Sequence, residues 1–311
     1  MNDHIDNSRR GALKCMLWAG TGVLWTVAGG VPRSALIGSA AAATNDLAFV
    51  QISDSHIGFS LDPNTDTPGT LAAAIDQLKA MPRKPALMLH TGDVSHLSKP
   101  AEFDTAEKII GASGFDTHYV PGEHDWLDDD GGKPFIARFQ KGAKQGNDGG
   151  AYYSFDQQGV HFVGLNNVTN LKAGGLGNLG PAQLAWLEQD LKGRAASQPI
   201  VVFAHIPLWT VYEQWGWGTD DGAQAITLLK RFGSVTVLNG HIHQIMQKVE
   251  GKVAFHTARS TAFPQPAPGT AASPGPMKVD AGKLRSMLGV ASVAVVHGQE
   301  KLAIIDTPLG A

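Results

Sequence analysis

The sequence contains a single cysteine, Cys15, among its 311 residues. One thiol excludes an internal disulfide framework and a zinc site built from thiolates. The chain also lacks the ~20 consecutive apolar residues that a membrane-spanning helix needs. The apolar run at residues 16–28 is shorter than this and is interrupted by glycines. We therefore expect no stable membrane insertion of the mature protein.

Charge of either sign is also scarce. Charged residues make up 17% of the chain, and the formal net charge is -3. This balance gives no electrostatic reason to bind a nucleic-acid polymer, and we expect no such partner. Hydrophobic residues make up 43% of the chain, which is enough for a sizeable core. The 37 glycines and 17 prolines favour a loop-rich α/β fold.

Residues 1–43 differ in kind from the rest of the chain. Arg9 and Arg10 precede the short apolar run, and residues 38–43 offer small side chains to a signal peptidase. This order resembles a bacterial twin-arginine signal peptide. A disordered tail with a chance pair of arginines is the alternative. We expect the signal to be removed, residues 44–311 to form one domain in the periplasm or outside the cell, and the twin-arginine export machinery to be a partner.

After the signal, apolar strand-like runs alternate with helical patterns. The sequence predicts strands at residues 47–52, 86–89, 117–120, 199–205 and 234–243, a hairpin over 151–167 that turns at Gln158 and Gly159, and late strands around Val253, Val293 and Leu302. It predicts helices at residues 71–81, 102–112, 181–194 and 223–232. Continuous apolar runs are typical of strands buried on both faces, so helices should cover the sheet and the fold class is α/β.

Carboxylate and imidazole side chains follow five of these strands. The residues at the carboxyl ends are Asp54 and His56, then Asp93, then Glu123, His124 and Asp125, then His205, and finally His241 and His243. Ligands of α/β sheets sit at the carboxyl ends of strands, so these side chains should gather at one edge. Each piece alone has an ordinary explanation, such as a turn aspartate or a buried histidine. Together they predict a metal centre.

The types of ligand restrict the metal. Oxygen and imidazole donors without cysteine suit Mn, Fe, Zn or Co and disfavour a closed structural zinc site. About seven ligands exceed the usual need of one ion, so we expect two divalent or mixed-valence ions that share a carboxylate. Two ions placed ~3.5–4 Å apart suit phosphoryl chemistry, because they can hold both the attacking and the leaving oxygen.

The ordered set Asp-Ser-His, Gly-Asp, Gly-Glu-His-Asp, His and Gly-His-Ile-His resembles the calcineurin-like metallophosphoesterase family. That family includes purple acid phosphatases and bacterial cyclic-nucleotide and glycerophosphodiester phosphodiesterases. The resemblance covers residues 47–247. It implies a four-layer sandwich in which two mixed β-sheets are flanked by helices. It also implies a small-molecule phosphoester substrate that is attacked by a metal-bound hydroxide.

The resemblance assigns a role to each residue of the set. It places Asp54, His56 and His243 on the first metal, Asp93 between the two metals, and His205, His241 and the residue at position 123 on the second metal. His124 would meet the phosphate or protonate the leaving group, and Asp125 would hold His124 in position. These nine residues are the candidate site.

Glu123 departs from the family pattern, which has asparagine at this position. Either Glu123 binds the second metal with an added negative charge, or it does not bind and that metal is held more weakly. The added charge favours a phosphodiester over a phosphomonoester. We therefore expect an exported phosphodiesterase with two metals. The alternative is a protein of the same fold that binds metal or phosphate and has lost activity through Glu123.

Other polar and aromatic residues carry weaker signals. The loop 208–218 holds three tryptophans and a tyrosine, and it either forms a wall of the substrate site or packs on the core. His96 could reach the phosphate, although a surface histidine is the simpler interpretation. We expect the remaining histidines of the domain to be structural or exposed, namely His90, His118, His161, His256 and His297.

Overall fold

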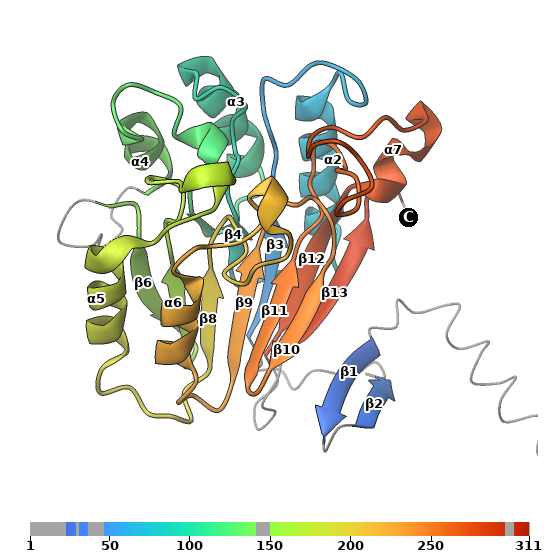
Figure 1. The fold of residues 1–311 in the computed structure, drawn as a ribbon. Helices are drawn as coiled ribbons and strands as arrows, with labels where there is room; N and C mark the ends of the chain where they lie inside the picture. The colour runs from blue at the N-terminus through green and yellow to red at the C-terminus, as the bar shows by residue number, and fades with distance from the viewer. Residues whose placement is uncertain (1–22, 29–30, 37–46, 141–149, 296–301, 311) are drawn as a thin grey trace, which may run out of the picture.

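The computed structural model describes residues 23–28, 31–36, 47–140, 150–295 and 302–310. Two mixed β-sheets form the centre of the fold (Figure 1). The five-stranded sheet has the order β13 (Ala303–Pro308), β12 (Gly289–Ala294), β3 (Ala48–Ile52), β4 (Met88–His90) and β5 (Thr117–Tyr119). The six-stranded sheet has the order β10 (Gln247–Glu250), β11 (Val253–Thr257), β9 (Val235–Asn239), β8 (Ile200–Phe203), β7 (Val160–Gly164) and β6 (Tyr153–Gln157).

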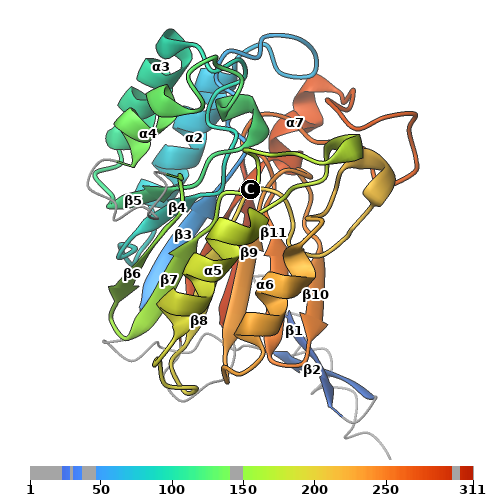
Figure 2. The ribbon, with the colours of Figure 1, turned by 60° about the vertical axis from the view of Figure 1, so that its left-hand side comes forward.

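Helices cover the outer face of each sheet (Figures 1 and 2). The five-stranded sheet is covered by α2 (Thr67–Lys79), α3 (Pro100–Gly111), α4 (Lys133–Phe139) and α7 (Ala281–Met287). The six-stranded sheet is covered by α5 (Gly180–Leu191) and α6 (Gly222–Leu229). The predicted sandwich of two mixed sheets flanked by helices is confirmed.

Three apolar clusters separate the four layers. In β8, Val201 and Phe203 point into the cluster between the sheets, while Val202 points to the cluster under α5 and α6. Phe49 of β3 meets Phe162 of β7 between the sheets, with ring centroids 5.3 Å apart. Because successive side chains of a strand point to opposite faces, a strand buried on both faces must be apolar throughout. This explains the continuous apolar runs of the sequence.

Most predicted elements are present, with shifted ends. The hairpin of β6 and β7 turns at Gln158 and Gly159 as predicted, and both residues have positive φ angles. Helix α2 begins four residues before the predicted start at residue 71, because the Asp66 carboxylate caps it by accepting a hydrogen bond from Gly69 N. The sequence analysis missed β10 and the seven-residue helices α4 and α7. Two turns of helix are too short to show a clear apolar period.

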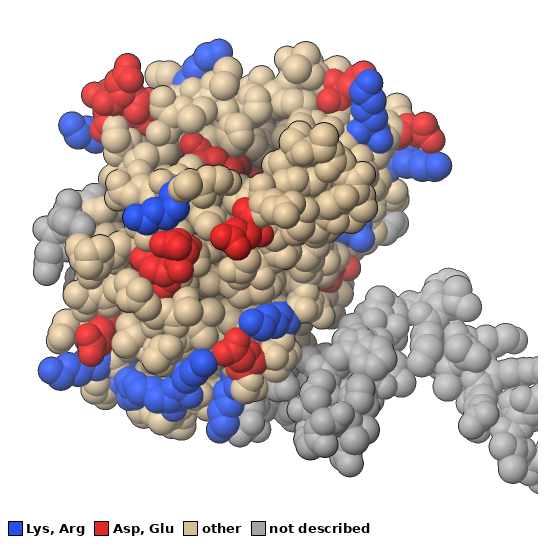
Figure 3. All heavy atoms as spheres, in the orientation of Figure 1, with Lys and Arg blue, Asp and Glu red and all other residues tan. Residues whose placement is uncertain are grey.

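The predicted signal peptide lies largely outside the described residues, including Arg9, Arg10, Cys15 and residues 38–43. Within it, β1 (Val23–Ala28) and β2 (Val31–Leu36) form a separate two-stranded antiparallel sheet. Among the residues that the structure describes, no helix combines the length and apolar character that crossing a bilayer requires. On the face in Figure 3, some acidic side chains lie in a hollow near the upper centre, and elsewhere acidic and basic side chains lie beside one another.

Candidate metal centre

The structure brings the seven predicted metal ligands together, and they form two adjoining clusters. In the first, Nε2 of His56 lies 3.2 Å from Nε2 of His243 and 3.5 Å from Oδ2 of Asp93. Oδ1 of Asp54 lies 3.2 Å from the same nitrogen of His243. These donor atoms come from the loops after β3, β4 and β9. They are the ligands that the resemblance assigns to the first metal.

The second cluster is centred on Glu123. Its two carboxylate oxygens lie 3.0 Å from Nε2 of His205 and 2.9 Å from Nδ1 of His241. Nε2 of His205 also lies 3.3 Å from Oδ2 of Asp93, the oxygen that faces His56. Asp93 therefore belongs to both clusters, as a bridging ligand must. Glu123 lies where a ligand of the second metal would lie, which favours the first of its two interpretations.

Unpaired donor atoms show that the second cluster fits a cation. Oε2 of Glu123, Nε2 of His205 and Nδ1 of His241 are all buried, and none has a hydrogen-bond partner with acceptable angles. Buried polar atoms are normally paired, so three orphans that converge on one point need an explanation. A metal ion would satisfy all three together.

The electrostatics of the clusters also favour bound positive charge. Burial disfavours charge on His205, but the carboxylates of Asp93 and Glu123 outweigh it and raise the pKa of His205 well above its ordinary value. Burial and the neighbouring imidazoles of His124 and His243 lower the pKa of His56 well below its ordinary value. His56 is therefore a neutral imidazole, the form that a metal binds.

The backbone is strained at the same positions. Asp54, His56, Asp93, His241 and His243 all have positive φ angles, between 40° and 70°. Non-glycine residues rarely adopt this region, and such outliers cluster at functional sites, where the surrounding structure holds them. Five of the seven predicted ligands therefore have a left-handed backbone conformation, which the surrounding structure must stabilise.

Backbone carbonyls fix the orientation of several imidazoles. Nδ1 of His205 lies 2.7 Å from the carbonyl oxygen of Thr91, and Nδ1 of His243 lies 2.5 Å from that of Phe263. A carbonyl only accepts, so each Nδ1 carries a proton, and in the neutral ring the lone pair of each Nε2 faces the cluster. Ligating histidines commonly use their outer nitrogen in this way.

The glycines before the ligands leave room for this convergence. A Cβ added to Gly92 would lie 2.5 Å from the ring of His205, and Gly92 has a φ of 95°. A Cβ on Gly122 would lie 2.1 Å from Oδ1 of Asp93. Both glycines are therefore needed for the loops to approach one another. Sequence reasoning quoted both glycines as part of the motif but did not assign them a role in the site.

His124 lies beside the two clusters. Its backbone N–H donates to Oδ1 of Asp93 over 2.9 Å, and its Nδ1 donates to the carbonyl oxygen of His96 over 2.7 Å. Nε2 is therefore the nitrogen left for a substrate. Burial disfavours charge on His124, but the carboxylates of Asp93 and Glu123 outweigh it and raise its pKa above the ordinary value. A raised pKa suits a group that donates a proton.

Asp125 acts on the turn of His124 through backbone N–H groups. Its buried carboxylate accepts hydrogen bonds from the backbone N–H groups of Val94, Ser95 and Gly122, at 2.8–3.0 Å. It thereby ties the loop that carries Asp93 to the turn that carries His124. Asp125 supports His124 by fixing the backbone of that turn, and the His96 carbonyl sets the orientation of the ring.

The tryptophan-rich loop packs mainly on the body of the protein. Trp217 is fully buried, and Trp209 packs against Phe255 with ring centroids 5.0 Å apart and planes tilted by 55°. Trp215 is partly exposed and meets Tyr212 and Trp217 edge to face. For Trp209 and Trp217 the structure therefore favours packing over a substrate wall.

The histidines expected to be structural are so where they are described. His90, His161 and His256 are buried, with polar partners Ser55, Asp190 and Asp306 respectively, and His118 stacks on Phe155. His297 lies outside the described residues.

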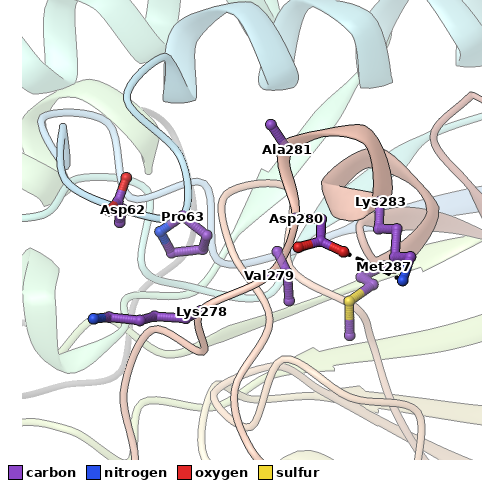
Figure 4. Close-up of a pocket in the computed structure, with 8 residues that line it drawn as sticks. All are labelled: Asp62, Pro63, Lys278, Val279, Asp280, Ala281, Lys283 and Met287. Carbon is purple, nitrogen blue, oxygen red and sulfur yellow. Dashed lines mark ion pairs between the residues drawn. The ribbon is translucent and has the colours of Figure 1, made fainter.

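A separate hollow of about 610 Å³ lies between the loop after β3 and the segment around α7 (Figure 4). It is lined by Asp62, Pro63, Lys278, Val279, Asp280, Ala281, Lys283 and Met287. Its charges are mixed, and Asp280 pairs with Lys283 at 3.3 Å. None of the nine candidate site residues is among those that line it.

Comparison with known proteins identifies relatives of the chain. Residues 47–245 match the model of the calcineurin-like phosphoesterase family. The chain is 28% identical over 233 residues to a probable cyclic nucleotide phosphodiesterase of Synechococcus, covering 71% of this chain and 83% of the relative. It is 24% identical over 231 residues to a glycerophosphodiester phosphodiesterase of Enterobacter lignolyticus, covering 70% of this chain and 78% of the relative.

Solved structures share the fold at low sequence identity. A dimetal phosphatase from Danio rerio superposes with a TM-score of 0.61 at 14% identity, covering 84% of this chain and 98% of that one. A purple acid phosphatase from yellow lupin superposes with a TM-score of 0.58 at 12% identity, covering 86% of this chain and 52% of that one.

Proposed function

Because the chain belongs to the calcineurin-like phosphoesterase family, we propose that it is an exported phosphodiesterase that works with two metal ions. One observation carries the proposal: seven carboxylate and imidazole side chains converge in two clusters that share Asp93. Asp54, His56 and His243 would hold one ion, Glu123, His205 and His241 the other, and Asp93 both. The bound ions would activate water for attack and offset charge on the phosphate.

The protein's own residues complete the site. The hydrogen bond from Nδ1 of His124 to the His96 carbonyl leaves Nε2, with the proton that it carries in the charged ring, to face the substrate. His124 would give this proton to the leaving oxygen as its bond to phosphorus breaks. Asp125 holds the turn of His124 against the loop of Asp93, so the acid and the shared ligand keep a fixed separation.

The charge of Glu123 supports a preference for diesters. Asp54 and Asp93 supply two negative charges to the clusters, and Glu123 adds a third where the family pattern has a neutral asparagine. The pKa of Glu123 is lowered well below its ordinary value, because His241 and His205 outweigh the cost of burial, so this charge is present. A less positive site loses more attraction for a monoester dianion than for a diester monoanion. The relatives named above are also phosphodiesterases.

The direct test is the hydrolysis of a chromogenic phosphodiester by the purified mature protein. We expect activity with Mn²⁺, loss of activity after chelation, and recovery when Mn²⁺ is restored. The matched phosphomonoester should be the poorer substrate. A protein that binds two equivalents of metal but hydrolyses neither ester would instead be the non-catalytic binding protein.

Glu123→Asn should shift the substrate preference. With two divalent ions bound, the substitution removes one negative charge beside them, so monoesterase activity should rise relative to diesterase activity. The measurement is the ratio of kcat/KM for the two chromogenic esters, with the metal content determined in both forms. A trivalent ion such as Fe³⁺ in the wild-type protein would restore the missing positive charge and remove the reason for a shift. If the wild-type protein holds two divalent ions and the ratio is unchanged, Glu123 does not tune the charge of the site.

Export depends on the arginine pair. We expect Arg9→Lys together with Arg10→Lys to retain the protein in the cytoplasm, because the twin-arginine machinery reads this pair. The measurement is the distribution of the full-length chain between cytoplasmic and periplasmic fractions. A control with Arg33→Lys, which lies in the same N-terminal segment outside the pair, should be exported normally. Undiminished export of the double variant would exclude this route.

A further inference from the structure

We infer that His96 is a positioning residue for the metal centre, which orients His56 through its side chain. This inference rests on the proposed metal centre but not on the identity of the substrate. The evidence is a contact that distinguishes His56 from His205 and His243. His205 and His243 donate their outer nitrogen to a backbone carbonyl. The outer nitrogen of His56 lies instead 3.3 Å from Nδ1 of His96.

The chemistry of the imidazole sets the direction of this bond. A metal ion would take the lone pair of His56 Nε2, and the neutral ring then carries its proton on Nδ1. Nδ1 of His96 must therefore accept, so the proton of His96 resides on its own Nε2. His96 thus does for His56 what the carbonyls of Thr91 and Phe263 do for His205 and His243.

His96 is held in place by its surroundings. Its backbone N–H donates to the carbonyl of Ile57 over 2.9 Å and to Oε2 of Glu102 over 3.2 Å. Ile57 directly follows His56, so this hydrogen bond fixes the two histidines relative to each other. The ring of Phe59 meets that of His96 edge to face, with centroids 5.3 Å apart.

The same residue also touches the proposed acid. The His96 ring stacks on that of His124 with centroids 4.8 Å apart and planes inclined by 15°. The His96 backbone carbonyl accepts the Nδ1 proton of His124. The side chain therefore contributes an acceptor to His56 and a flat surface to His124, and substitutions can separate these two contributions.

Two substitutions separate them. His96→Phe keeps a ring of similar size and its stacking, but it removes the acceptor. His96→Asn removes the ring, but its amide oxygen can take the place of Nδ1. We expect His96→Phe to weaken Mn²⁺ binding in one of the two sites by about 10–100-fold, the usual cost of losing such a support. His96→Asn should remain within a few-fold of the wild-type affinity.

The measurement is titration of the metal-free protein with Mn²⁺ by calorimetry, with thermal unfolding of each variant to confirm folding. His118→Asn is the matched control, because His118 stacks on Phe155 and is not among the candidate site residues. It should bind both ions as the wild type does. Metal affinity is measured without substrate, so a failure of the proposed activity would not affect the result.

Three results would overturn the inference. The first is wild-type affinity in His96→Phe. The second is an equal loss of affinity in both variants, since this would indicate that the ring itself supports the site. The third is binding of an additional equivalent of metal that both His96 variants lose. His56, His96 and His124 place donor atoms within 4.8 Å of one another, so this result would make His96 a ligand.

Discussion

Asp93→Asn should abolish phosphodiester hydrolysis and lower the metal content of the protein. Oδ2 of Asp93 faces His56 at 3.5 Å and His205 at 3.3 Å, so one oxygen serves both clusters. An amide has almost the same shape but no net charge, and it cannot offset two cations at once. The measurements are hydrolysis of the chromogenic diester and metal analysis of the purified variant.

The shape of asparagine makes this substitution informative. Oδ1 of Asp93 accepts the backbone N–H of His124, and an asparagine Oδ1 can keep this bond, so the turn should stay in place. Asp116→Asn is the matched control, because Asp116 is 71% exposed and contacts His118 on the surface. It should keep full activity and full metal content. Two bound ions with normal turnover in Asp93→Asn would show that Asp93 does not bridge the metals.

The sequence predicted that the seven candidate ligands would lie together because their order follows from the topology. Each ligand comes directly after an apolar strand, and β3, β4, β8 and β9 are neighbours of a parallel partner in the two sheets. Parallel neighbours end at the same edge, and residues 187 positions apart, such as Asp54 and His241, meet there. Periodicity and residue type suffice to predict this level of structure.

Periodicity and residue type did not predict the contacts of Asp125 and His96, the residues that support the candidate site. Asp125 was expected to hold His124 in position, but the sequence did not indicate that its carboxylate would bind backbone N–H groups of another loop. His96 was expected at the surface, yet its ring is half-buried against His56 and His124. The contacts of both residues depend on the distance between two loops in space. A single sequence contains no pattern that gives this distance. The loop that carries His56 and the loop that carries His96 are joined by an isolated β-bridge between Ile57 and Ser95. A pairing of one residue with one residue leaves no pattern in the sequence.

His124→Ala should keep most of the metal and lose rate by about 10²–10⁴-fold on a diester with an alkyl leaving group, the usual contribution of a general acid. The seven ligands should stay in place because alanine retains the backbone N–H that donates to Oδ1 of Asp93. The measurements are kcat and metal content, with His118→Ala as a control that should change neither.

The dependence on the leaving group tests the role of His124 most sharply. A phenolate with a low pKa leaves without help, whereas an alkoxide needs a proton as its bond to phosphorus breaks. We therefore expect His124→Ala to lose little rate on a diester with a p-nitrophenol leaving group and far more on one with an alkyl alcohol. An equal loss on both diesters would mean that His124 binds the phosphate in the transition state without giving up its proton. Full activity on both would show that the nitrogen left free by the His96 carbonyl does not take part in the reaction.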